Sequence, residues 1–133
     1  MGVEVLLDFL AGGKAVHTAG GAIILAHPYR FGRPPVDSLA VAEAVRRQLD
    51  AIEGLNMNCS AAQNRLATEL AARWGLPAVA GSDAHTLDWV GRYVTVFPQP
   101  IADEAALVAA IRRGETSILL REGFHTTNAS VTA

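Results

Sequence analysis

Short apolar segments alternate along this chain with longer stretches of helical spacing. Strands are expected at residues 22–26, 51–55, 77–80, 93–97 and 116–120. Helices are expected over residues 3–19, from a cap at Asp37 or Ser38 to residue 49, over 60–74 and over 103–113. Strands that alternate with helices indicate βαβ units, and uniformly apolar strands are typical of a parallel sheet covered on both faces. The alternation predicts one α/β domain over residues 1–120 with mostly parallel strands, followed by a frayed polar tail at 121–133.

The ends of two helices carry recognisable capping signals. Ser60 and Gln63 have the spacing of a capping box, and Gly75 supplies the stop after the helix. Asp103 is expected to cap the last helix, which Gly114 ends. These signals place the helix boundaries, and with them the loops that follow the strands.

Composition narrows the class of protein. The chain has 133 residues, of which 50% are hydrophobic and 18% charged, and this excludes wholesale disorder. A net charge of −2 gives no sign of nucleic-acid binding, and no apolar run is long enough to cross a membrane. Cys59 is the single cysteine, which suits a reducing compartment, and Glu4 and Asp8 do not fit a signal peptide. We therefore expect a cytoplasmic protein, with Cys59 acting as a small hydrophobic residue.

Potential metal ligands follow two of the predicted strands. His27 comes after the first strand, and Asp83 and His85 come after the third. The loops that follow parallel strands lie at one edge of a sheet, where ligands bind in α/β proteins. Two imidazoles and a carboxylate suit zinc, manganese or iron. The placement predicts a metal site formed by His27, Asp83 and His85, although each residue alone is also compatible with a loop or capping role.

Three further polar residues belong to the same predicted edge. Arg30 follows His27 closely and is suited to holding a phosphate, although it is also compatible with an ordinary surface position. Glu53 lies in the second strand, where it could pair with an arginine, and Asn56 follows that strand. Gly81 is expected to permit a close turn out of the third strand.

At these residues the chain resembles the PHP family, the polymerase-and-histidinol-phosphatase metallohydrolases. The resemblance is carried by the segments GGAIILAHPYR at 20–30, AIE at 51–53 with Asn56, and GSDAHT at 81–86. It implies a distorted (β/α) barrel with a polynuclear metal centre, in which His27, Asp83 and His85 are metal ligands. Glu53 and Asn56 would line the site without direct assignment as ligands.

The family pattern is represented only in its C-terminal half. PHP enzymes begin with a His-x-His strand, and no His-x-His occurs in this sequence. The resemblance therefore implies a partial barrel, with the remaining ligands supplied by another chain that carries the N-terminal half. Self-association into a homo-oligomer is the alternative way to cover the apolar surface that such a half-barrel would leave exposed.

Two functions remain open from the sequence. One is a metal-dependent phosphoesterase module, in which metals polarise the phosphate and activate a water molecule, with Arg30 binding the phosphate of a small molecule. The other is a catalytically inactive metal-binding or interaction domain derived from a truncated PHP domain. A simple α/β binding protein without metal is a weaker third possibility.

Overall fold

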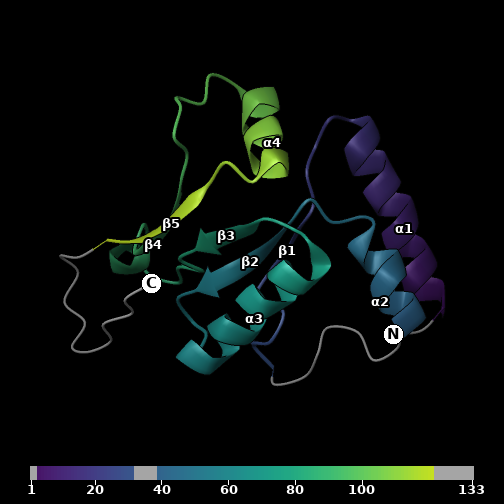
Figure 1. Cartoon of the computed structure of the whole chain (residues 1–133), viewed down its shortest axis with the longest axis horizontal. Helices are drawn as coiled ribbons and strands as arrows, with labels where there is room; N and C mark the ends of the chain where they lie inside the picture. Colours follow the sequence, from purple (N-terminus) through teal and green to yellow (C-terminus); the bar gives the residue numbers. More distant parts are fainter. Residues whose placement is uncertain (1–2, 32–38, 122–133) are drawn as a thin grey trace.

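A computed structural model describes residues 3–31 and 39–121 of the chain (Figure 1). Its elements, in chain order, are α1 (Val3–Thr18), β1 (Ile24–Leu25), α2 (Leu39–Arg46), β2 (Ala51–Asn56), α3 (Ala61–Trp74), β3 (Ala78–Gly81), the 3-10 turn η1 (Leu87–Trp89), β4 (Tyr93–Val96), α4 (Glu104–Arg113) and β5 (Ser117–Leu120). The expected alternation of helices and strands is confirmed. The expected caps at Asp37 or Ser38, and the tail beyond residue 121, lie outside the described residues.

A parallel sheet of three strands, in the order β1-β2-β3, forms the centre of the fold. Ile24 is paired with Ala51, and Ile52 with Ala78, so the three strands run side by side in one direction. The first strand is shorter than expected, because only Ile24 and Leu25 join the ladder. The sheet is open and no closed barrel is formed by the described residues, so the α/β fold is a partial one, as predicted.

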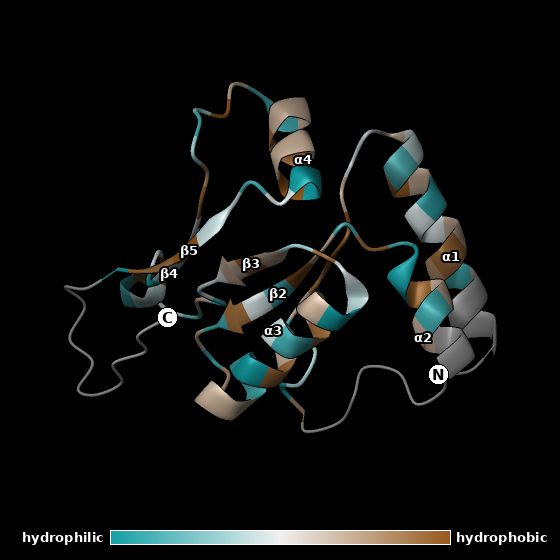
Figure 2. Cartoon of the chain, in the orientation of Figure 1, coloured by the Kyte–Doolittle hydropathy of each residue, from teal (hydrophilic) through white to brown (hydrophobic). Residues whose placement is uncertain are grey.

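Helices cover both faces of this sheet. On one face Ile52, which is fully buried, packs with Leu70 and Ala71 of α3, and Leu25 and Trp74 join them. The opposite face forms a second cluster, in which Ala51 and Val79 of the sheet pack with Ile111 of α4, together with Phe97 and Leu107. Figure 2 shows the corresponding colours: apolar strands at the centre, and helices that also carry hydrophilic residues. Alternate side chains along β2 thus serve two cores, as the uniformly apolar strands predict.

The last two strands do not continue the parallel sheet. β4 pairs with β5 in antiparallel fashion in a separate two-stranded sheet, while β1, β2 and β3 pair in parallel, so the arrangement is mostly parallel as expected. β4 does not continue the parallel sheet after β3, because the connection over residues 82–92 contains only the short turn η1. A parallel strand needs a crossover of about a dozen or more residues, usually a helix, to return to the starting edge. Here the chain turns back, and Thr95 lies beside Ala80, whose N–H donates to the Thr95 Oγ1 at 2.9 Å.

The predicted caps of α3 and α4 are present. Ser60 Oγ accepts from the Gln63 N–H at 3.3 Å, and Gln63 Oε1 accepts from the Ser60 N–H at 2.8 Å, so the capping box is complete. Asp103 accepts from the Ala106 N–H at 2.8 Å. Both helices end at a glycine in the left-handed conformation, Gly75 and Gly114. The caps therefore fix where the chain enters and leaves each covering helix.

Asp50 joins four segments at the amino-terminal end of the sheet. Its Oδ2 lies 2.9 Å from His17 Nε2 of α1 and accepts from the Ile23 N–H at 2.8 Å. Its Oδ1 accepts from Arg112 Nε of α4 at 2.8 Å, and Arg112 also donates to the Gly21 carbonyl at 2.8 Å. His17 is thus a partner of Asp50 at the end of the sheet opposite to the candidate ligands.

α1 packs beside α2 at the edge of the molecule (Figure 1). Within the described ranges, no helix combines the length and the apolarity needed to cross a lipid bilayer.

Candidate functional site

The loops that follow β1 and β3 meet at the carboxyl-terminal edge of the sheet. Arg30, in the loop after β1, forms an ion pair with Asp83, in the loop after β3. The side chains of the two residues are 28% and 23% exposed, so the pair lies at the surface of this edge. Two segments that are distant in sequence are thereby brought together, as the predicted α/β topology requires.

Two candidate ligands have an unusual backbone conformation. His27 has a φ of 28° and Asp83 a φ of 45°, and they are the non-glycine residues with positive φ in the described part of the chain. Such conformations are unfavourable for most side chains and concentrate at functional sites, where surrounding contacts hold them. The left-handed backbone therefore marks the same two positions that the sequence motifs mark.

The Asp83–His85 turn is held through the carbonyl of Asp83. This oxygen accepts from Asn58 Nδ2 at 2.7 Å and lies 2.8 Å from His85 Nδ1. Because a carbonyl oxygen only accepts, Nδ1 of His85 carries the proton in this contact, and the lone pair is left on Nε2. A histidine that donates one ring N–H to a backbone carbonyl is typical of metal ligands. Sequence reasoning missed Asn58, although its place directly after β2 was a signal for it.

Glu53 connects the loop after β1 with the end of β2. Its Oε2 accepts from the His27 backbone N–H at 2.8 Å and from Asn56 Nδ2 at 3.0 Å. Asn56 is 1% exposed, and its Oδ1 accepts from the Asn58 N–H at 2.8 Å. Its backbone is fixed by Asn64 of α3, which donates to the Asn56 carbonyl at 3.1 Å and accepts its N–H at 3.0 Å. In the described part of the chain the partners of Glu53 are His27 and Asn56 and not an arginine, contrary to one expectation.

The first turn of α3 also supports this edge. Gln63, the second partner of the capping box, donates through Nε2 to the carbonyls of Tyr29 and Arg30, at 3.1 Å and 2.9 Å. The Arg30 N–H donates in turn to the His27 carbonyl at 3.1 Å. Gln63 thus caps a helix and positions the loop that carries His27 and Arg30. The sequence indicated only its capping role.

Gly81 has a different role from the one expected. Its φ is not positive, so no left-handed turn requires a glycine here. A Cβ at this position would lie 2.2 Å from Glu53 Oε1. The absence of a side chain therefore leaves space for the Glu53 carboxylate.

Neighbouring groups at this edge shift the pKa values of Asp83 and Cys59. The Asn58 amide lowers the pKa of the Asp83 carboxyl, and Arg30 acts in the same direction, which together outweigh the opposing effect of burial. Burial raises the pKa of the Cys59 thiol, with Glu53 and Asp83 adding to the rise and Arg30 opposing it. Glu53, Asp83 and Arg30 therefore lie within electrostatic reach of the same thiol. A raised pKa keeps Cys59 protonated, in agreement with an unreactive small residue.

The donors suit a transition metal in chemistry, but they are not assembled around one. Imidazole and carboxylate groups are present, the contact of His85 Nδ1 with the Asp83 carbonyl is compatible with a free Nε2, and Gly81 makes room for a carboxylate. Across residues 3–31 and 39–121, however, no three His, Cys, Asp or Glu side chains are grouped closely enough to hold a metal ion. Arg30 is bound to Asp83 in this arrangement, so a metal at Asp83 requires the arginine to move.

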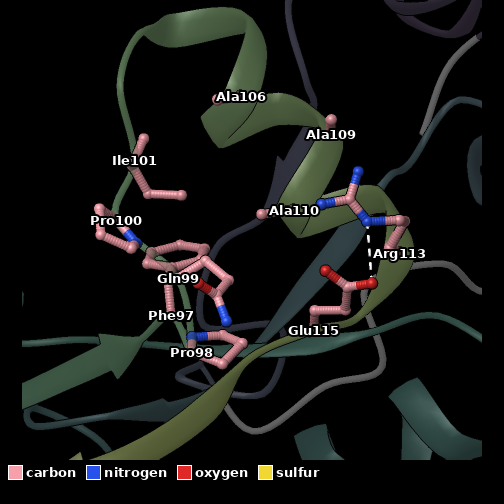
Figure 3. A pocket seen from close by; sticks show the side chains of 10 residues that line it. All are labelled: Phe97, Pro98, Gln99, Pro100, Ile101, Ala106, Ala109, Ala110, Arg113 and Glu115. Atoms are coloured by element: carbon pink, nitrogen blue, oxygen red, sulfur yellow. Dashed lines mark ion pairs between the residues drawn. The ribbon is translucent and has the colours of Figure 1, made fainter.

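A separate pocket of about 200 Å³ lies between α4 and the loop after β4 (Figure 3). Its wall includes Phe97, Pro100 and Ile101 on one side and Ala110 and Arg113 on the other. Arg113 is paired with Glu115 at 3.0 Å. None of the candidate ligands lines this pocket, so it is not part of the candidate site.

The fold and the candidate site together are those of an α/β protein: an open sheet with a polar cluster at the carboxyl ends of its parallel strands. Residues 61–116 match the PHP-associated family (PHP_C). This match, which covers less than half of the chain, identifies residues 61–116 as a PHP-associated segment and supports the resemblance seen in the motifs. The matched segment includes Asp83 and His85, whereas His27, Arg30, Glu53 and Asn56 precede it. No curated protein and no solved structure matches the chain.

Proposed function

We propose that this chain supplies part of the active site of a PHP-type metal-dependent phosphoesterase. In this proposal His27, Asp83 and His85 bind a divalent zinc, manganese or iron ion, and Arg30 binds the phosphate of a phosphorylated small molecule. The observation that carries the proposal is the left-handed backbone of His27 and Asp83, which lie near the starts of the loops that follow β1 and β3. Positive φ at non-glycine residues concentrates at functional sites, and here it falls on two residues of the family motifs.

The roles of the residues follow from their chemistry. When bound, the metal would supply Lewis-acid polarisation of the phosphate and an activated water nucleophile. His85 offers the free Nε2 lone pair, because its Nδ1 proton is engaged by the Asp83 carbonyl. Arg30 offers a planar set of donors that matches a phosphate, and its ion pair with Asp83 keeps it at the site.

A second candidate function is a metal-binding or interaction domain without catalytic activity. It is favoured by two observations: the described side chains form no assembled group of three metal donors, and the sequence has no His-x-His. Under our proposal, further donors would come from a polypeptide segment outside these 133 residues. A second copy of the chain would cover apolar surface but would not supply a His-x-His either.

Metal analysis and a phosphatase assay, taken together, test the proposal. Purified chain is first titrated with zinc and manganese, and hydrolysis of a phosphomonoester is then measured with each metal, alone and with a separately produced N-terminal PHP half. Metal binding with hydrolysis that requires the added half supports the phosphoesterase proposal. Metal binding without hydrolysis under either condition supports the non-catalytic alternative. The absence of any metal binding contradicts both.

A further inference from the structure

The pocket between α4 and the loop after β4 has two unlike sides (Figure 3). The loop contributes larger apolar side chains, among them those of Phe97, Pro100 and Ile101. The helix contributes small side chains, which leave the space open: Ala106, Ala109 and Ala110. An apolar group in this space would be shielded from water by both sides.

The loop side is held in place by its own sequence and by the core. Pro98 and Pro100 each have a φ fixed by the proline ring, with Gln99 between them. Phe97, which begins the loop, packs against the core cluster that includes Ile111 of α4. The pocket is therefore formed before a ligand arrives, and binding requires little ordering of the chain.

An exposed ion pair belongs to the lining of the pocket. Arg113 Nε and Glu115 Oε1 are 3.0 Å apart, and both residues line the space. Their side chains are 55% and 49% exposed, and exposed ion pairs contribute little to stability. A charged ligand can therefore replace either partner at low cost.

The two signs of charge restrict the class of ligand. A simple anion at Arg113 would also meet the Glu115 carboxylate, and a simple cation at Glu115 would meet the guanidinium. A carboxylate and an ammonium group on one carbon satisfy both partners, and they are the head group of a free α-amino acid. In Figure 3 Arg113 and Glu115 lie together, across the open space from Pro100 and Ile101, so the head group and an apolar side chain have separate places.

The size of the pocket sets a further limit. Its volume of about 200 Å³ exceeds the roughly 150 Å³ in which a benzene ring is held. It is smaller than the sites of about 300 Å³ or more that take drug-sized molecules. The space therefore suits the side chain of an amino acid such as leucine and is too small for a nucleotide.

We propose that this pocket binds a free apolar α-amino acid. The α-carboxylate would pair with Arg113 and the α-ammonium group with Glu115, while the side chain packs against Phe97, Ile101 and the alanines of α4. None of the candidate metal ligands lines this pocket, so the inference does not depend on the proposed function.

NMR titration of the full chain with L-leucine tests the class of ligand. Three analogues each lack one part of it: L-leucinamide has no carboxylate, 4-methylpentanoate has no ammonium group, and glycine has no side chain. We expect saturable binding of leucine, with shifts at residues 97–115, and affinities lower by about tenfold or more for each analogue. Equal affinity for leucine and 4-methylpentanoate would show that the ammonium group is not recognised and would overturn the inference.

Two substitutions test the place of binding, each with a matched control. Ala109→Leu fills the pocket, and Ala105→Leu makes the same change at an exposed position of α4. Arg113→Gln removes the positive charge, and Arg65→Gln is its control, because Arg65 pairs with Glu69 on α3 and its side chain is 73% exposed. We expect both pocket variants to lower leucine affinity about tenfold or more, and both controls to bind as wild type.

Thermal melting shows which variants are folded. If Ala109→Leu does not fold, Arg113→Gln decides, because it alters a side chain that is 55% exposed. Absence of saturable leucine binding by wild type, or wild-type affinity in the folded pocket variants, would overturn the inference. Neither result bears on the proposed function, which is measured with metal and a phosphomonoester.

Discussion

Arg30 forms an ion pair with Asp83, 53 residues further along the chain, across the carboxyl-terminal edge of the sheet. The guanidinium occupies a carboxylate that the proposed metal site needs. Under the proposed function, Arg30 balances the charge of Asp83 in the absence of metal and would become available to a phosphate once a metal binds Asp83. The ion pair therefore links the residue proposed to bind phosphate with a residue proposed to bind metal.

Arg30→Gln should strengthen zinc binding. The substitution removes a competing cation, and for a partly exposed ion pair we expect a gain of roughly fivefold in affinity. Arg47→Gln, in the turn that follows α2, is the control because its side chain is 72% exposed. Isothermal titration of the three proteins with zinc measures the effect. Unchanged or weaker binding by Arg30→Gln would show that the arginine does not compete with metal.

Ser60→Ala should lower stability without affecting metal binding. The substitution removes the hydroxyl half of the capping box, and a lost N-cap costs about 1 kcal/mol. Gln63 keeps its hydrogen bonds to the Tyr29 and Arg30 carbonyls, so the loop at the site is retained. Thermal melting and zinc titration are compared with wild type. Unchanged stability together with a large loss of zinc affinity would assign Ser60 to the site instead.

The helix caps also show how much of the fold the sequence predicts. Ser60, Gln63, Gly75, Asp103 and Gly114 act through contacts within a few residues, and the boundaries that they predict are observed. The pairing of β4 with β5 in a separate sheet is a contact between segments on either side of α4, and periodicity does not carry that information.

The candidate site, like the fold, can be predicted only in part from the sequence. His27, Asp83 and His85 can be predicted to share one edge, because each follows a strand of the same parallel sheet. The Arg30–Asp83 pair and the space that Gly81 leaves for Glu53 are contacts between separate loops and strands. Such contacts depend on register and side-chain direction, which the sequence does not specify residue by residue.

Asp50 should make stability sensitive to acid. Burial raises the pKa of its carboxyl, but hydrogen bonds from the Ile23 N–H, Arg112 and His17 outweigh this and hold the pKa below its ordinary value of 3.8. A lowered folded-state pKa stabilises the fold above the ordinary value, and this contribution is lost as the pH falls through the lowered one.

Asp50→Asn therefore should cost about 2 kcal/mol at neutral pH, as expected for hydrogen bonds to a charged group. The difference from wild type should be constant above pH 4 to 5 and shrink below the ordinary pKa of 3.8. Urea unfolding across this pH range measures it, with Glu69→Gln as an exposed control. A difference that grows on acidification would contradict the assignment.

The isolated chain should self-associate. Ile24, Leu119 and Leu120 are 39%, 49% and 42% exposed, and they lie on the short strands β1 and β5. Burying such side chains is favourable, so we expect a dimer or higher oligomer at micromolar concentration. Sedimentation velocity measures it, and replacing Leu119 and Leu120 by lysine should shift the chain toward monomer. A wild-type chain that sediments as a monomer would contradict this expectation.

The most direct test of the metal site is zinc titration of wild type and Asp83→Asn. The substitution keeps the shape of the side chain but removes its charge, so the fold should persist while zinc binding is lost. Cys59→Ser should bind zinc as wild type does, since the thiol is not a proposed ligand. Binding by wild type and Cys59→Ser, with none by folded Asp83→Asn, is the predicted result. Equal zinc uptake by wild type and Asp83→Asn would remove Asp83 from the site and contradict the proposed function.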